Sequence, residues 1–172
     1  MDAILALVEN RYTRIVMVGL LFLGLQTTIL NDMRPFGVCL QIMLLLAVAS
    51  GLAKGSETGA IAGFVVGLLY DMVLTTPLGL CAAVFAVVGY LSGFAHLFVH
   101  ESTWWTRIIV GSGASLVGMI LLPIAFTITG SEGVLTTHVL TVAVVVAVFN
   151  AILTVPVERV CRWALREPKL KR

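Results

Sequence analysis

Six apolar runs separated by short polar turns constrain this chain more than any other feature. The runs cover residues 12–30, 38–53, 59–75, 78–98, 107–128 and 134–155. Each has roughly 16 to 22 residues, and a hydrocarbon core of about 30 Å is crossed by about 20 helical residues. A composition of 59% apolar and 12% charged residues excludes an ordinary water-soluble domain. The sequence therefore predicts an all-α membrane protein, one domain over residues 1–172, folded as a six-transmembrane-helix bundle.

The basic residues are concentrated on one side of these runs. Six spans place both termini on the same side of the membrane, together with Lys54, Arg107 and the basic tail at residues 158–172. Arg34 is the only basic residue that falls on the other side. Under the positive-inside rule, this distribution predicts that both termini lie in the cytoplasm.

The tail begins with an amphipathic pattern. Five apolar residues at its start, counting Val157 directly before it, fall on one helical face, and these are Val157, Val160, Cys161, Ala164 and Leu165. The pattern predicts a short helix lying on anionic lipid, and a docking surface for a cytoplasmic partner is the alternative. We expect Trp163, together with Trp104 and Trp105, to anchor the protein at the membrane interface.

Small residues recur at four-residue spacing in the third and fourth runs. The glycines concerned are Gly59, Gly63, Gly67, Gly89 and Gly93. Residues four apart share one face of a helix, and glycines on a membrane helix let another backbone approach closely. These positions therefore predict close helix packing, or a groove that receives the transmembrane helix of a partner.

Asp71 is the only charged residue well inside a long apolar run, which makes it a candidate functional residue. It lies towards the outer end of its helix, where the helix dipole disfavours a negative charge. An ionised carboxylate there needs a donor. We therefore expect an outer polar cluster of Asp71, Arg34 and Gln41. The alternative is that Asp71 reaches the headgroup water without a partner.

Other candidate sites are weaker. His96, His100 and Glu101 resemble metal ligands in spacing, but no third His or Cys completes a set, so we predict no metal site. The segment around Ser115 lacks the Gly-x-Ser-x-Gly pattern of a hydrolase. The sequence predicts no catalytic residue and no cofactor, and no basic–aromatic pattern indicates nucleic acid. Asn150 is expected to form an interhelical hydrogen bond.

Two motifs and the turn between them resemble a known family. The third run reads Gly-Phe-Val-Val-Gly-Leu-Leu-Tyr-Asp and ends at Asp71, and Pro-Leu-Gly follows at residues 77–79. The fourth run contains Gly-Tyr-Leu-Ser-Gly at residues 89–93. With six spans, this order resembles the bacterial rod-shape-determining MreD family. The resemblance is specific over residues 59–93, which is about a fifth of the chain.

The resemblance implies a non-enzymatic inner-membrane scaffold of the cell-elongation machinery. Its direct partner would be MreC, a single-span protein with a large external domain. Through MreC it would help to connect MreB filaments with RodA and the elongation transpeptidase in peptidoglycan synthesis. The family is also similar in fold to the substrate-binding (S) subunits of energy-coupling-factor transporters. A substrate-capture subunit of a vitamin-type importer therefore remains the alternative, with an intramembrane enzyme third, and a homodimer is left open.

Overall fold

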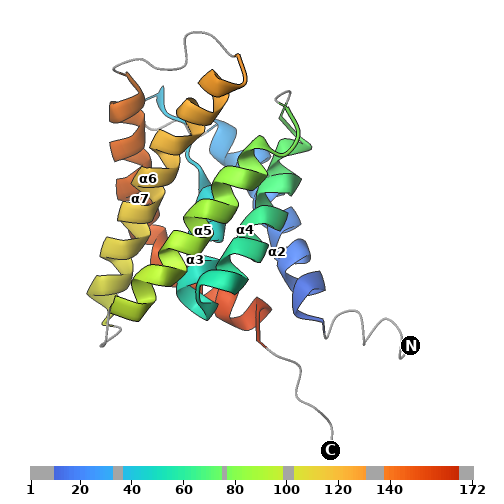
Figure 1. The fold of residues 1–172 in the computed structure, drawn as a ribbon, viewed down its shortest axis with the longest axis vertical. Coiled ribbons are helices and arrows are strands. Elements are labelled where there is room, and N and C mark those ends of the chain that lie inside the picture. The colour runs from blue at the N-terminus through green and yellow to red at the C-terminus, as the bar shows by residue number, and fades with distance from the viewer. Residues whose placement is uncertain (1–9, 33–36, 75–76, 99–102, 131–137, 167–172) are drawn as a thin grey trace, which may run out of the picture.

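A computed structural model describes residues 10–32, 37–74, 77–98, 103–130 and 138–166, except for the side chains of residues 96–98 and 138. These residues form an up-and-down bundle of antiparallel helices (Figure 1). The helices are α2 (Arg11–Leu25), which continues as the π-helical turn η1 (Gln26–Leu30), α3 (Ile42–Lys54), α4 (Ser56–Asp71), α5 (Leu80–Phe98), α6 (Trp104–Ile128) and α7 (His138–Ala164). The predicted all-α class is confirmed.

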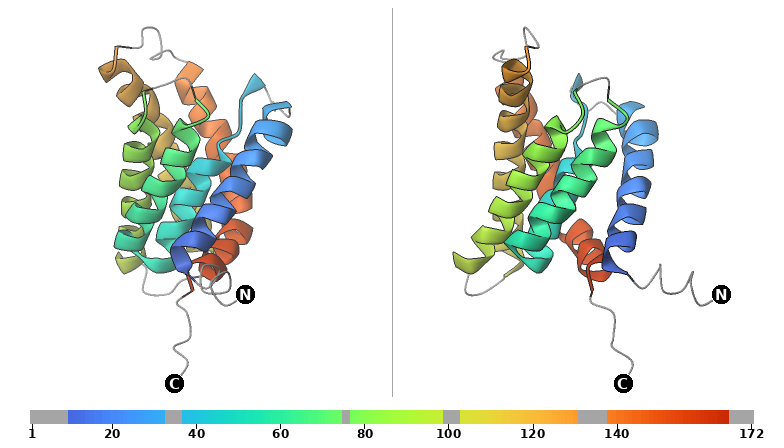
Figure 2. Two further views of the ribbon diagram at one scale, coloured as in Figure 1. Left: turned by 90° about the vertical axis from the view of Figure 1, so that its right-hand side faces the viewer. Right: turned by 45° about the vertical axis from the view of Figure 1, so that its right-hand side comes forward.

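Helix α3 lies in the centre of the bundle and is enclosed by the other helices (Figures 1 and 2). Every residue from Ile42 to Leu52 is buried. A helix that is apolar on all faces must be covered on all faces, and this run of Leu, Ala and Val has that pattern. With 13 residues, α3 is about 20 Å long. It is therefore shorter than a membrane core of about 30 Å.

Three helical segments are long and apolar enough to cross a membrane, judged by length and composition: Arg11–Leu30, Trp104–Ile128 and Val139–Ala164. Ile42–Lys54 and Leu80–Ala95 are shorter apolar helices. The order of helices in the described residues follows the six predicted runs. The count of six spans stays a prediction.

Two helix boundaries differ from the predicted spans. Residues 38–41 are not helical, although Val38 and Leu40 are buried, and α3 begins only at Ile42. Helix α4 ends at Asp71, and residues 72–74 already turn back towards α5. At each boundary a buried polar side chain binds the start of the helix that follows.

Helix α7 continues through the predicted end of the last span at residue 155, with Pro156 inside it. Its final turns pack against α3, because the Cys161 Sγ lies 3.8 Å from the Leu46 carbonyl oxygen. Arg14 of α2 donates to the Arg166 carbonyl at 3.0 Å. Four of the five apolar residues on the tail's face are buried in the protein: Val157, Cys161, Ala164 and Leu165. This face therefore packs on protein, which corrects the prediction of a helix lying on lipid.

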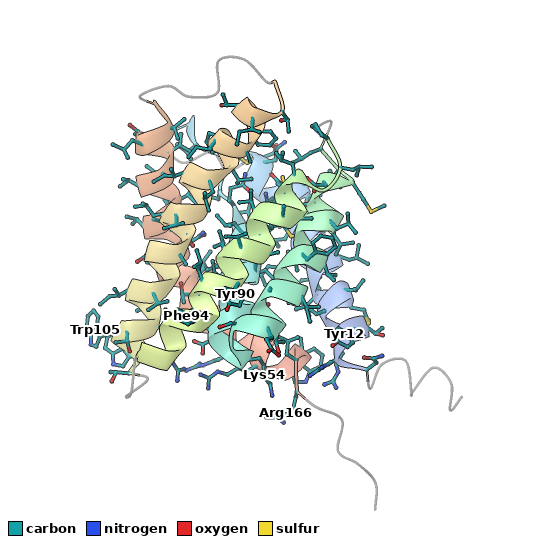
Figure 3. All side chains as sticks on the ribbon, in the orientation of Figure 1. Tyr12, Lys54, Tyr90, Phe94, Trp105 and Arg166 are labelled. Atoms are coloured by element: carbon teal, nitrogen blue, oxygen red, sulfur yellow. The ribbon has the colours of Figure 1, made fainter. Side chains whose placement is uncertain are left out.

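One end of the bundle carries all the basic residues that the structure describes: Arg11, Arg14, Lys54, Arg107, Arg159, Arg162 and Arg166. We call this the basic end. Figure 3 shows Lys54 and Arg166 there, near Tyr12. The three tryptophans expected to be interface anchors also lie at this end and are more than half exposed: Trp104, Trp105 and Trp163. Their role as anchors stays a prediction.

Candidate functional site

The Asp71 carboxylate is buried between the end of α4 and the start of α5, with 1% of the residue exposed. Its Oδ2 accepts hydrogen bonds from the N–H groups of Gly79 at 2.9 Å and Ala82 at 3.1 Å. Its Oδ1 accepts one from the Cys81 N–H at 3.1 Å. The first N–H groups of a helix have no partner inside that helix. Asp71 therefore caps α5 from the preceding helix.

The turn before α5 makes this cap possible. Gly79 has φ +97°, a left-handed conformation that favours glycine, directly before the helix begins at Leu80. A carboxylate at the C-terminus of α4 opposes that helix dipole by about 0.3–1 kcal/mol. Hydrogen bonds to a charged group contribute about 1.5–3 kcal/mol each. Three such bonds, at the favourable N-terminus of α5, outweigh the unfavourable dipole of α4.

For Asp71, the structure corrects the alternative expectation and leaves the pairing with Arg34 untested. Its donors among the described residues are backbone N–H groups. Arg34 lies outside the described residues, so its pairing with Asp71 stays a prediction. The alternative, contact with headgroup water, does not fit a residue that is 1% exposed. The signal that could have identified the donors is the Pro-Leu-Gly turn, because such a turn starts a new helix close to the end of the old one.

A second buried polar group lies at the same end of the bundle. The Gln26 Oε1 accepts from the Met43 N–H at 3.0 Å, and its Nε2 donates to the Gln41 Oε1 at 3.3 Å. The Gln41 Nε2 in turn donates to the Tyr70 hydroxyl at 3.2 Å. Gln41 therefore joins Gln26 and Tyr70, not the Asp71 carboxylate. The sequence analysis missed Gln26 and Tyr70.

Gln26 and Asp71 perform the same task for two helices. Gln26 accepts a hydrogen bond from a backbone N–H group at the start of α3, and Asp71 accepts hydrogen bonds from backbone N–H groups at the start of α5. An unsatisfied N–H group in an apolar medium costs several kcal/mol. These two side chains therefore allow α3 and α5 to begin inside the apolar bundle. Gln26 opens a π-helical turn, a local irregularity that recurs at functional sites in other proteins.

The five glycines predicted from four-residue spacing lie inside the bundle. A Cβ atom on Gly63 would collide with the Phe85 carbonyl oxygen of α5, and one on Gly67 would lie 2.5 Å from the Ala82 Cα. Gly59 and Gly89 face each other, and Gly93 meets the backbone at the start of α4. The glycines thus let α4 and α5 pack backbone to backbone. This corrects their interpretation as an open partner groove, because the chain itself fills it.

An open groove lies instead between α5 and α6. It encloses about 240 Å³ and is lined mainly by small and β-branched residues, among them Ser92, Ala95, Gly113 and Ala114. A Cβ atom added to Gly113 would meet no atom within 4 Å. Gly113 therefore differs from Gly59, Gly63, Gly67, Gly89 and Gly93, each of which is already in close contact with another helix or turn of this chain.

Two polar contacts hold α6 against α7. The Asn150 Nδ2 donates to the Ser115 Oγ at 3.1 Å, which confirms the predicted interhelical hydrogen bond. At the basic end, the buried Glu158 of α7 forms an ion pair with Arg107 of α6 at 3.5 Å, and a second one with Arg162 of its own helix at 2.6 Å. These contacts fix the register of the two helices.

Among the described residues, no group of three His, Cys, Asp or Glu side chains is placed to hold a metal ion. The side chains of His96, His100 and Glu101 lie outside the described part of the chain. The buried polar side chains described above, such as Asp71, Gln26 and Asn150, form hydrogen bonds with helix ends or neighbouring helices. Their role in this structure is therefore to stabilise the bundle.

Comparison with known protein families identifies a match over nearly the whole chain. A model of the rod shape-determining protein MreD family matches residues 9–164, far beyond the motifs at residues 59–93. No curated protein and no solved structure matches the chain. The expected likeness to the S subunits of energy-coupling-factor transporters stays a prediction.

Proposed function

The chain belongs to the rod shape-determining MreD family, and we propose that it is a non-enzymatic scaffold of the bacterial elongation complex in the inner membrane. The family match over residues 9–164 is the observation that carries this proposal. In the proposal all six apolar runs cross the membrane, the second as α3 together with the non-helical residues 38–41 before it. The basic end faces the cytoplasm, so both termini lie there, in keeping with the positive-inside rule.

The proposed direct partner is MreC. A single-span protein with an external domain would contact the bundle in the membrane and the end that carries Asp71 outside it. Through MreC, the scaffold would couple MreB filaments to RodA and the elongation transpeptidase. The buried side chains that cap the starts of α3 and α5 support such a role, because they tie neighbouring helices together and a scaffold must present a fixed surface.

We place the span of MreC in the groove between α5 and α6. Lipid tails are as apolar as a helix surface, so helices associate in membranes through close packing on small residues. Gly113 offers such a surface with nothing in front of it, whereas the glycines of α4 and α5 are already packed. The small side chains beside it, Ala95 and Ala114, leave room for a second backbone.

The test of this placement compares three leucine substitutions in cells that produce tagged protein. Gly113→Leu fills the groove and is expected to reduce the amount of MreC recovered with the protein at an unchanged protein level. Gly24→Leu is the matched control, because a Cβ at Gly24 also meets nothing within 4 Å but lies on α2, away from α5 and α6. Gly63→Leu should lower the level of the protein itself. Equal recovery of MreC with Gly113→Leu and Gly24→Leu would refute the placement.

The function itself is tested by depletion in a rod-shaped host. We expect depleted cells to become round, and the wild type and Gly24→Leu to restore rods. Cells that keep their shape but lose uptake of a small molecule would contradict the proposal and favour the importer.

A further inference from the structure

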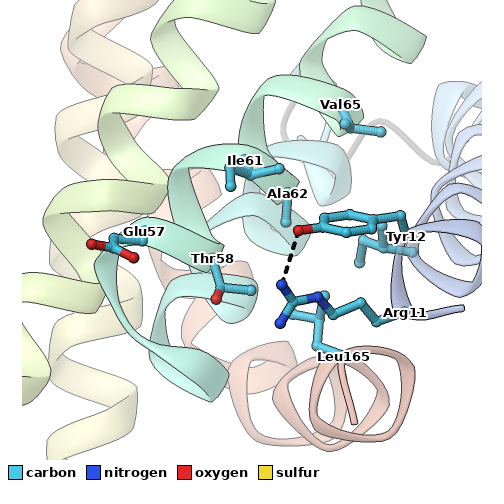
Figure 4. Close-up of a pocket in the computed structure, with 9 residues that line it drawn as sticks. Arg11, Tyr12, Glu57, Thr58, Ile61, Ala62, Val65 and Leu165 are labelled. Carbon is cyan, nitrogen blue, oxygen red and sulfur yellow. Dashed lines mark hydrogen bonds between the residues drawn. The ribbon is translucent and has the colours of Figure 1, made fainter. Parts of the chain in front are cut away.

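A small cavity opens at the basic end between the starts of α2 and α4 and the end of α7 (Figure 4). Its volume is about 70 Å³. One half of its wall is polar, with Arg11 and Tyr12 from α2 and Thr58 from α4. The other half is apolar and includes Ile61 and Val65 of α4. The cavity is therefore amphipathic, and nothing in the proposed partner binding uses it.

The polar half presents a positioned guanidinium. The Arg11 Nη2 donates to the Tyr12 hydroxyl at 2.9 Å, and the Arg11 Cζ lies 4.9 Å from the centre of the Tyr12 ring. The planar fork of a guanidinium matches the oxygen atoms of a phosphate group. Thr58 faces Arg11 across the cavity, in the first turn of α4 (Figure 4). The partial positive charge of a helix N-terminus adds to the preference for an anion.

Among the described residues, one acid also lines the cavity and must be considered. Glu57 belongs to the first turn of α4, but its carboxylate points away from Arg11 in Figure 4. The described residues of the basic end include more positive than negative side chains, which favours an anion there.

The apolar half leads away from the basic end along α4. Ile61 is 48% exposed, and Val65 lies one turn further along the same helix. Soluble ligands generally occupy pockets of about 300–1,000 Å³, which is far larger than this cavity. A molecule with a small anionic group and a long apolar chain fits both halves, because its chain can lie outside the cavity on Ile61 and Val65.

We propose that this cavity binds the phosphate group of an anionic glycerophospholipid from the leaflet at the basic end, with one acyl chain along α4. The bound lipid bridges the starts of α2 and α4. The proposal does not depend on the partner proposed above.

The test uses the purified full-length chain at about 0.15 M salt, where charges more than about 8 Å apart are largely screened. Retained lipid is counted by native mass spectrometry after addition of phosphatidylglycerol or of phosphatidylcholine with the same acyl chains. We expect a clear preference for phosphatidylglycerol. Arg11→Gln should weaken phosphatidylglycerol binding about tenfold, because it removes charge-assisted hydrogen bonds. Arg159→Gln removes an exposed cation of the same end outside the cavity and should leave binding unchanged.

A second variant is needed because Arg11→Gln could weaken lipid binding by disturbing the structure of α2. Thr58→Val keeps the shape of the side chain on α4 and should weaken phosphatidylglycerol binding about threefold. Equal effects of Arg11→Gln and Arg159→Gln, or no preference over phosphatidylcholine, would overturn the proposal. Inorganic phosphate that competes at the concentration of the lipid would also overturn it, since it would make the cavity a simple anion site.

Discussion

Removal of the Asp71 carboxylate is expected to destabilise the bundle at the start of α5. Asp71→Ala leaves the N–H groups of Gly79, Cys81 and Ala82 without their acceptor, in a place where Asp71 itself is 1% exposed. Asp71→Asn keeps one carbonyl oxygen, which can serve part of this set but carries no charge.

The magnitude follows from the three bonds. A buried polar group left without its partner costs about 1–3 kcal/mol. Partial relaxation of the turn at Gly79 reduces the total, so we expect Asp71→Ala to lower the free energy of unfolding by about 3–5 kcal/mol. Asp71→Asn should cost about 1–2 kcal/mol. For a chain of this size, 1 kcal/mol shifts the melting temperature by about 2–4 °C. The alanine variant should therefore melt about 10 °C lower than the wild type.

The assay is thermal unfolding of the purified protein in one detergent. The quantity measured at each temperature is the fraction of the protein that remains monodisperse. Asp32→Ala is the matched control, because Asp32 is an exposed acid at the same end of the bundle. It should melt with the wild type. If Asp71→Ala had the same melting temperature as the wild type, the capping role would be refuted.

A charge swap separates the cap from an ion pair. If Asp71 paired with Arg34, the double variant Asp71→Arg with Arg34→Asp would recover stability. A cap predicts no recovery, because the swap places a cation against the positive N-terminus of α5. Recovery of stability by the double variant would therefore establish the ion pair in place of the cap.

Three further substitutions test the packing of the bundle. Gly63→Leu should reduce the amount of folded protein severalfold, since its side chain meets the Phe85 backbone, and immunoblotting of membranes measures this level. Asn150→Leu removes the hydrogen bond to Ser115 and should cost about 0.6–1.7 kcal/mol, measured by the same thermal assay. Glu158→Gln weakens ion pairs whose arginines are partly exposed, so it should cost about 1 kcal/mol and increase hydrogen exchange at the basic ends of α6 and α7.

The positions of the helices could be predicted from the sequence more accurately than the surfaces against which they pack. The apolar runs located every described helix, because burial away from water requires a continuous apolar pattern. The spacing of Gly59, Gly63 and Gly67 correctly indicated a close helix contact. Spacing does not say whether the approaching helix belongs to the same chain, and in this protein it is α5. The tail shows the same difficulty, because an amphipathic face suits lipid and protein equally.

The polar site was located but not explained from the sequence. Asp71 was identified because a lone acid in an apolar run needs a partner. Arg34, the partner predicted from the sequence, lies outside the described residues, and the donors that the structure shows are backbone groups eight to eleven residues later in the chain. Backbone donors become visible only when the turn at Gly79 and the start of α5 are known. Gln26 was missed for the same reason, because its partner is the N–H group of Met43.

The most direct test of the scaffold function is capture of the tagged protein from native membranes in mild detergent, with mass spectrometry of proteins and small molecules. A scaffold predicts recovery of MreC, a single-span protein with a large external domain, in stoichiometric amount, and its loss with Gly113→Leu but not with Gly24→Leu. Recovery of a stoichiometric metabolite together with cytoplasmic ATPase subunits would contradict the scaffold and establish a transport function instead.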